Sequence, residues 1–137
     1  MDPYSTNIDS IIAKQDLIGR LVTIHGTIRR NRGLKLIIQK TRAIKKGEIH
    51  ELILTNNIVD NDRIINDAAI IGFVEFLTSG LLKAEDKLFI RNKEIGTIIG
   101  FDETHMPNHQ NILIYSKIFK PGLDLELHCG NVVYFID

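Results

Sequence analysis

Short apolar and β-branched runs alternate with polar turns along most of the chain. The runs that we expect to form strands are residues 21–28, 34–38, 48–55, 69–77, 87–90, 94–101, 112–115, 123–127 and 132–136. Short strands separated by turns are typical of antiparallel barrels and sandwiches. The pattern therefore predicts an all-β, mainly antiparallel fold, and specifically a small closed or partly open β-barrel of about 6–8 strands.

Three local features refine this prediction. Residues 8–18 have apolar side chains at an imperfect helical spacing, which predicts a short N-terminal helix or docked arm. Residues 29–33 form a polar, arginine-rich turn that should join the first two strands as a hairpin. Gly72, Gly96 and Gly100 lie within predicted strands, where glycines mark the bends that a closing barrel requires.

Length and composition fit one folded domain that spans residues 1–137. The chain has 44% hydrophobic and 25% charged residues, as expected for a globular protein with a buried core. Cys129 is the only cysteine, so an intramolecular disulfide is excluded. This cysteine usage, together with a polar first segment that does not resemble a secretory signal, predicts a cytoplasmic protein.

The charges of the chain balance. Lysine plus arginine and aspartate plus glutamate number 17 each, so the net charge is zero. Such a chain has no overall field that attracts nucleic acid or an anionic membrane, and no run reaches the roughly 18 apolar residues of a membrane span. We therefore expect no membrane partner. RNA binding through a barrel face ranks last among the possible functions, because residues 29–46 have the charge but no aromatic residue. Weak charge repulsion does allow self-association, so a homo-oligomer is compatible with the sequence.

One loop, residues 100–111, contains two histidines, two carboxylates, two asparagines and a proline. His105 and His109 have the spacing that would place them on one face of a helix. Pro107 argues against this, because the residue before a proline avoids helical backbone. We expect a structured loop that presents imidazole and carboxylate groups at one rim of the barrel.

The strand at residues 48–55 is the expected partner of this loop. Adjacent side chains in a strand point to opposite faces, so His50 and Glu51 cannot share a face. Both faces are otherwise apolar, which predicts a strand that is covered on both sides. A polar residue in such a strand is expected to be partly buried. The sequence leaves open whether His50 or Glu51 faces the loop.

These residue types permit two kinds of chemistry. Imidazoles and carboxylates are suitable ligands for zinc, iron or manganese, although no familiar spaced motif such as His-Glu-x-x-His occurs. Without a metal, a histidine beside a carboxylate is a competent general acid or base near neutral pH. The candidate metal ligands are His50, His105 and His109, with Glu51, Asp102 or Glu103 as alternatives. The candidate catalytic residues are His105, His109, Glu51 and Glu103. In a third interpretation the groups only satisfy one another structurally.

Arginines and amides supply candidates for substrate binding, because guanidinium groups hold carboxylates and phosphates bidentately. The candidates are Arg30, Arg32, Arg42, Asn108 and Asn111. The arginine-rich turn can also be read as a solvated turn without function. The sequence thus favours a small enzyme that acts on a small polar or anionic metabolite, with or without a divalent metal. The alternative is a non-catalytic ligand-binding or protein-assembly barrel.

The segments that carry a family resemblance are residues 47–52, 72–76 and 100–111. Together they resemble a small bacterial family of uncharacterised proteins, which implies a common fold and no particular activity. Residues 72–100 are also similar to the barrel portion of sorbitol-type phosphotransferase components and of translation-factor barrels, which implies a small closed β-barrel. The phosphotransferase components carry a phosphoacceptor histidine just before this segment, whereas residues 68–71 contain none, so phosphotransfer is not expected.

Overall fold

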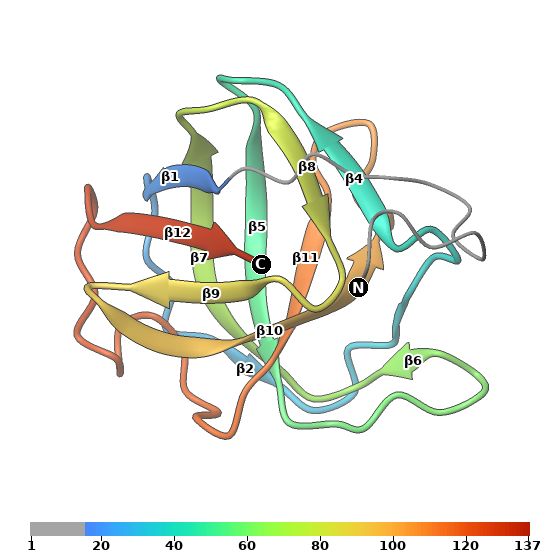
Figure 1. Cartoon of the computed structure of the whole chain (residues 1–137). Coiled ribbons are helices and arrows are strands. Elements are labelled where there is room, and N and C mark those ends of the chain that lie inside the picture. The colour runs from blue at the N-terminus through green and yellow to red at the C-terminus, as the bar shows by residue number, and fades with distance from the viewer. Residues whose placement is uncertain (1–15) are drawn as a thin grey trace.

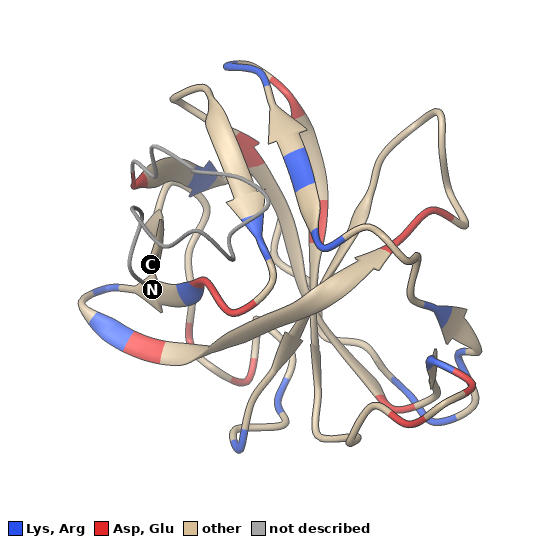
Figure 2. Cartoon of the chain, turned by 45° about the vertical axis from the view of Figure 1, so that its right-hand side comes forward, with Lys and Arg blue, Asp and Glu red and all other residues tan. Residues whose placement is uncertain are grey.

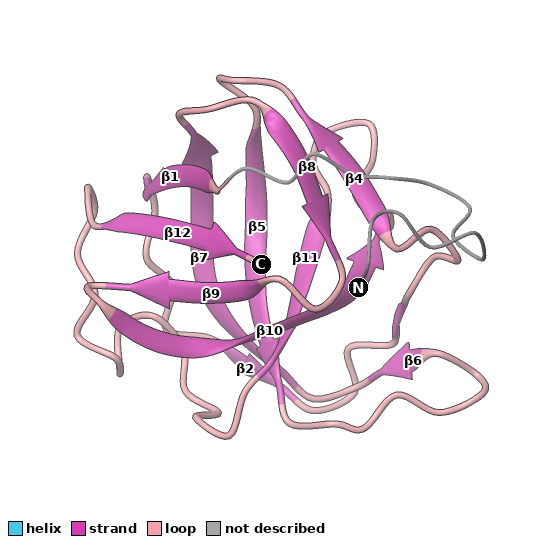
Figure 3. Cartoon of the chain, in the orientation of Figure 1, coloured by secondary structure: helices cyan, strands magenta, loops and turns pink. Residues whose placement is uncertain are grey.

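The computed structural model describes residues 16–137, and this part of the chain contains strands, turns and loops but no helix (Figure 3). Among these residues there is accordingly no helix long and apolar enough to cross a membrane. The strands are β1 (Leu17–Leu21), β2 (Ile28–Arg29), β3 (Leu34–Lys35), β4 (Thr41–Ile44), β5 (Ile49–Thr55), β6 (Ile64–Ile65), β7 (Ala68–Phe76), β8 (Gly80–Lys83), β9 (Lys87–Ile90), β10 (Lys93–Asp102), β11 (Asn111–Tyr115) and β12 (Val132–Ile136). The all-β prediction is confirmed.

Seven strands close into a ring, in the order β1, β12, β9, β10, β11, β5 and β7, with β7 paired back to β1. Neighbours in the ring are antiparallel except β11 and β5, which run parallel. In Figure 1, β9, β10 and β12 cross in front of β5 and β7. The ring is uneven and corresponds to the predicted small, partly open barrel.

The apolar residues form two clusters on opposite faces of β5, β7 and β11. The larger cluster fills the barrel and includes Leu52, Ile71 and Ile112. The smaller, which we call the outer cluster, comprises Leu34, Leu36, Ile53, Ile65, Ala68, Ile70 and Leu113. Because β3 and β6 contribute to the outer cluster, β5 is covered on both faces, as its two-sided apolar pattern predicted.

Glycines lie where the ladders of the barrel change register. The β5–β7 register shifts opposite Gly72, and the β10 ladders shift at Gly96 and Gly100. Gly72 has a φ of +144°, and a Cβ atom there would lie 2.0 Å from the carbonyl oxygen of Thr23. The chain can cross β7 closely at this point only because the residue is glycine. The predicted role of these glycines in bending the barrel is confirmed.

The first strand begins earlier than the pattern predicted. Gly19 lies inside β1, where it packs against Val74 and Glu75 of β7, and so does not end a preceding element. Residues 22–27, which we expected to be strand, instead run along β7 with single backbone hydrogen bonds to Phe73 and Ile71. The predicted helix or arm at residues 8–18 lies mostly outside the described residues; its last two residues belong to β1.

Two further predictions of strand structure are wrong. The turn at residues 29–33 does not make a hairpin, because β2 pairs with β7 and β3 pairs with β6. Residues 123–127 form successive turns closed by hydrogen bonds from Asp124 and Leu125 to Pro121 and from Leu127 to Gly122. Their alternating leucines match the strand period, but the local turns bury only one side of the segment.

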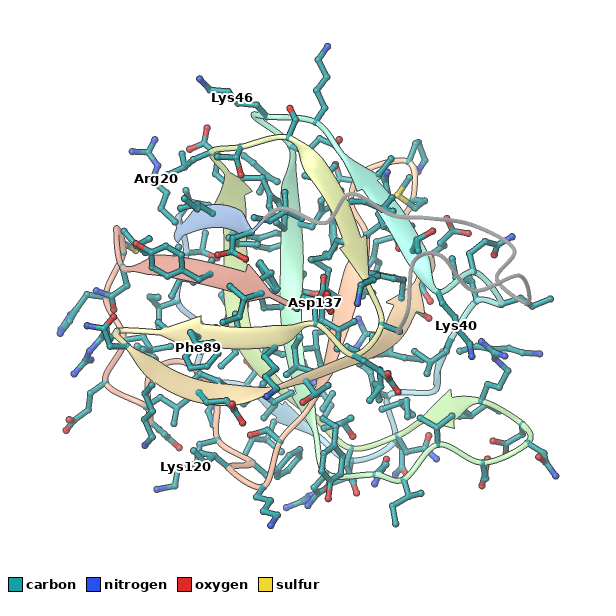
Figure 4. All side chains as sticks on the ribbon, in the orientation of Figure 1. Arg20, Lys40, Lys46, Phe89, Lys120 and Asp137 are labelled. Carbon is teal, nitrogen blue, oxygen red and sulfur yellow. The ribbon has the colours of Figure 1, made fainter. Side chains whose placement is uncertain are left out.

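The surface carries interspersed charges of both signs (Figure 2). The side chains of Arg20, Lys40, Lys46 and Lys120, labelled in Figure 4, extend away from the barrel. Most of the charged residues are therefore solvated, and the few buried polar groups are the ones that require an explanation.

Candidate functional site

Three side chains meet on the outer face of the barrel: Glu51, His105 and His109. Each offers one ligand atom, and these atoms lie within 4.8 Å of one another. We call this group the Glu–His–His cluster. It joins the middle of the chain to the loop between β10 and β11, as the sequence predicted for that loop and the strand at residues 48–55.

The strand β5 determines that Glu51, and not His50, reaches the two histidines of the loop. Glu51 lies opposite Phe73 of β7 and Asn111 of β11, on the face that carries Ile53 and the outer cluster. Its backbone nitrogen donates to the carbonyl oxygen of Gln110 at 3.0 Å, which holds the loop against the strand. With 8% of its surface exposed, Glu51 is a buried carboxylate.

His109 is the least satisfied group of the cluster. Its Nε2 atom is buried and has no hydrogen-bond partner among the described residues, while Oε1 of Glu51 lies 3.9 Å away. The ring packs edge-on against Phe73, with 4.8 Å between the ring centroids, and its Nδ1 atom contacts the side-chain nitrogen of Asn108 at 2.8 Å. Burial lowers the pKa of His109; Glu51 opposes this effect, and the charges of His105, His50 and Arg32 add to it.

A tight turn brings His105 next to His109. The backbone nitrogens of Asn108 and His109 donate to the carbonyl oxygen of His105, and the ring centroids are 4.9 Å apart. The turn is not a continuous helix, in agreement with the prediction made from the proline. Two donor groups face the ring of His105: the side-chain nitrogen of Asn111 lies 3.3 Å from Nδ1, and Nη2 of Arg32 lies 3.5 Å from Nε2.

Asp102 supports the loop and is not part of the cluster. Its carboxylate is 1% exposed and accepts hydrogen bonds of 2.9 Å from the backbone nitrogens of Lys35 and Thr104, the hydroxyl of Thr104 and the side chain of Asn111. Asn111 thus connects Asp102 to His105. A carboxylate with this many donors acts as a structural anchor.

His50 is also buried, with 4% exposed, but both of its ring nitrogens are occupied. The backbone nitrogen of Gln110 donates to Nδ1 at 2.9 Å, so Nε2 carries the proton and donates to Glu48 at 2.8 Å. Burial lowers the pKa of His50, and the hydrogen bond to Glu48 opposes the effect. The expected metal ligand His50 is therefore outside the cluster and holds the residue that follows His109 in place.

A pocket of about 460 Å³ opens onto the cluster. Its lining residues are His25, Thr27, Arg29, Arg32, Glu51, Ile70, His105 and His109. The pocket is therefore rich in imidazole and guanidinium groups, with a single carboxylate. Its volume falls within the usual range of small-molecule sites.

A larger groove of about 810 Å³ is lined by residues 35–39, 61–64 and 102–104, which include the apolar Leu36, Ile37, Ile38 and Ile64. It contains no histidine, and the loop contributes the anchored Asp102 and the exposed Glu103 and Thr104. We therefore favour the smaller pocket as the functional site, because chemical groups converge there.

The other predicted site residues have separate roles. Arg30 stacks over Phe119 and lies 3.7 Å from Asp67, and Arg42 binds Glu48 at 3.1 Å. Glu103 accepts a hydrogen bond from Gln110. Of the five predicted substrate-binding residues, only Arg32 lines the pocket, while Asn108 and Asn111 contact the histidine rings from behind.

Sequence reasoning missed His25, Thr27 and Arg29 as pocket residues. His25 and Thr27 come from the irregular segment at residues 22–27, and Arg29 ends β2. His25 donates its backbone nitrogen to Ile71 and bonds to the Thr23 hydroxyl through Nε2. No local motif marks these residues. The signal that could have found them is Gly72, whose missing side chain allows residues 23 and 24 to approach β7 closely.

Comparison with known proteins gives a family without an assigned activity. A search of curated proteins found no match, and neither did a search of solved structures. The expected similarity to phosphotransferase and translation-factor barrels therefore stays a prediction. A family model described as a family of unknown function, DUF6917, matches residues 11–136, which cover nearly the whole chain. The chain belongs to the DUF6917 family.

Proposed function

We propose that the protein is an enzyme that acts on a small polar or anionic metabolite with the help of a divalent metal ion held by Glu51, His105 and His109. The observation that carries this proposal is the convergence of the three ligand atoms within 4.8 Å at the floor of a pocket. Two imidazoles and one carboxylate are a ligand set that binds zinc or iron(II) and leaves further coordination positions open.

The buried Nε2 atom of His109 supports this role. A buried imidazole nitrogen without a hydrogen-bond partner lowers the stability of the folded state. An apolar side chain would fill the same space without this cost. A cation between His109 and Glu51 would give both groups a partner. The lowered pKa of His109 keeps its ring neutral near pH 7, as metal binding requires.

Ligand histidines also need an acceptor behind the ring, for the nitrogen that carries the proton. Asn108 is exposed and contacts Nδ1 of His109, so its amide oxygen can turn toward that atom. The side-chain nitrogen of Asn111 donates to Asp102 at 2.9 Å and lies 3.3 Å from Nδ1 of His105, so this amide is held in place beside the ring. The two asparagines can therefore orient the two rings.

The chemistry follows from the arrangement. A metal ion held by Glu51, His105 and His109 would supply Lewis-acid chemistry to a substrate oxygen or a water molecule in the pocket. His25 lines the same pocket without belonging to the cluster and is placed to transfer a proton. These roles describe metal-assisted acid–base chemistry.

Acid–base catalysis without a metal is the second candidate, favoured by the 3.9 Å approach of Glu51 to His109. In that case the carboxylate would orient the imidazole and stabilise its charged form. A binding pocket without turnover, as in a non-catalytic module, would use the same residues.

Metal content tests the proposal. Protein purified without a histidine tag is equilibrated separately with zinc, cobalt(II), manganese(II) and iron(II), and the bound metal is measured after gel filtration. We expect a single ion per chain for at least one metal, and an affinity at least about 100-fold lower in His109→Asn and Glu51→Gln.

Matched controls are His128→Asn and Glu94→Gln, which change an exposed histidine and an exposed carboxylate away from the pocket. Both should bind metal like the wild type. A thermal-shift measurement on the wild type needs no variant, because a ligand of the folded state raises its stability by about 2.7 kcal/mol at 100 times Kd. If none of the four metals binds or stabilises the wild type, the metal role is wrong.

A further inference from the structure

We propose that Arg29 and Arg32 form an oxyanion-binding subsite, so that the substrate of this pocket carries a carboxylate or phosphate group. This inference deepens the proposed function, since it assigns the chemical class of the ligand. The inference rests on the pocket of the proposed function. Its test does not require a bound metal, because the anions are titrated into metal-free protein.

The pairing of the seven arginines in the chain distinguishes these two from the rest. Arg20, Arg30 and Arg42 pair with carboxylates. The other two, Arg63 and Arg91, donate to backbone carbonyl oxygens.

Arg29 and Arg32 have neither kind of acceptor among residues 16–137, and both line the pocket of the Glu–His–His cluster. Arg32 is half-buried, and within residues 16–137 the hydrogen-bond partner of its guanidinium is the ring nitrogen of His105, at 3.5 Å. A neutral imidazole is a weak partner for a guanidinium group, whose planar donors match a carboxylate or phosphate. Arg32 therefore has donors available in the pocket where a ligand would lie.

The charge of the pocket points to the same ligand class. Two guanidinium groups face one carboxylate, so the pocket has an excess of positive charge while its histidines are neutral. A divalent ion on the cluster would increase this excess. An anion with one oxygen toward the cluster and another toward Arg32 would balance the charge, whereas a cationic ligand would be repelled.

The backbone fixes where the two arginines lie. Arg29 ends β2, which pairs with β7 at Ala68. Arg32 is held by a hydrogen bond of 3.0 Å from its backbone nitrogen to the carbonyl oxygen of Asn66. Both positions are thus attached to the chain around the start of β7, and Ile70 of the same strand lines the pocket. The subsite is therefore built on ordered backbone.

Anion titration tests the subsite. Inorganic phosphate and malonate are titrated separately by calorimetry into metal-free wild type and into Arg29→Gln, Arg32→Gln and Arg30→Gln. Arg30 is the matched control, because it belongs to the same turn but pairs with Asp67 outside the pocket. We expect the affinity to fall about tenfold or more in Arg29→Gln and Arg32→Gln and to change less than about threefold in Arg30→Gln.

The comparison of the two anions distinguishes a phosphate substrate from a carboxylate substrate. Cobalt(II) affinity of the same variants separates this inference from the metal proposal, because loss of a positive charge beside the cluster should not weaken cobalt binding. Absence of binding by both anions, or an equal loss in all three variants, would overturn the subsite even if the metal binds. Arginine-dependent anion binding without metal binding would uphold the subsite and reject the metal.

Discussion

Oε1 of Glu51 lies 3.9 Å from Nε2 of His109, although the two residues are far apart in the sequence. The parallel pairing of β5 with β11 produces this approach, because it places Glu51 beside Asn111, two residues after His109. The distance is too long for a hydrogen bond and suits two ligands of one ion. The distance between these two atoms therefore fits a shared ligand better than a stabilising hydrogen bond.

Two buried histidines should respond differently to replacement by leucine. His50 makes two hydrogen bonds through its ring, so His50→Leu should lower the free energy of unfolding by about 2–3 kcal/mol. His109→Leu removes the unpartnered Nε2 and a single contact, from Nδ1 to the exposed side chain of Asn108, and should stay within about 1 kcal/mol of the wild type. Urea unfolding of metal-free protein measures both. A larger loss in His109→Leu would show that His109 is mainly structural.

Stability should decrease as the medium becomes acidic. Burial lowers the pKa of His50 and of His109 below the ordinary value of 6.5, so both rings are neutral in the folded protein while unfolded histidines bind protons. Below that pH the unfolded state binds more protons, and the free energy of unfolding falls until the pH reaches the lowered folded-state pKa.

The variant His50→Leu isolates one of these two contributions. Its slope of unfolding free energy against pH, measured by urea titration at several pH values below 6.5, should be shallower than that of the wild type. The reduction can reach about 1.4 kcal/mol per pH unit, which corresponds to one proton. An unchanged slope would contradict the assignment of His50 as a buried neutral ring.

Asp102→Asn should affect the cluster from a distance. The amide cannot accept all the donors that now bind the carboxylate, so we expect a loss of about 2–3 kcal/mol in unfolding free energy. Because Asn111 connects Asp102 to His105, metal affinity should also fall, by about tenfold. Asp124→Asn, at an exposed turn, is the control. Unchanged metal affinity in Asp102→Asn would rule out a positioning role.

Gly72→Ala tests the crossing that brings His25 and Arg29 to the pocket. The added Cβ would meet the carbonyl oxygen of Thr23 at 2.0 Å, so the variant should lose about 3 kcal/mol or more, or fail to fold. Gly33→Ala also has a positive φ, but open space around it, and should lose only about 1 kcal/mol. Thermal unfolding compares the two, and equal losses would mean that the crossing is not tight.

Local sequence patterns were sufficient for much of the barrel. The two-sided apolar run around Glu51 identified a strand covered on both faces. The glycines at positions 72, 96 and 100 marked the register shifts of the barrel's ladders. These features depend on residues close in the chain and on steric needs that only glycine meets. The prediction of a strand at residues 123–127 was wrong because leucines with a period of two also occur in successive turns.

The site could be predicted only in part. The loop with His105 and His109 was evident from its composition, but the choice between His50 and Glu51 depended on which face of β5 turns outward. That face is determined by the parallel pairing with β11, which strand periodicity does not encode. Arg29 enters the pocket through the pairing of β2 with β7, and a prediction of a local hairpin excluded that contact.

Anomalous diffraction from crystals of the protein grown with zinc tests the central claim most directly. The account predicts one strong anomalous peak at about 2 Å from a carboxylate oxygen of Glu51 and from ring nitrogens of His105 and His109. A peak that lies elsewhere, or no peak in crystals soaked at saturating zinc, would contradict it.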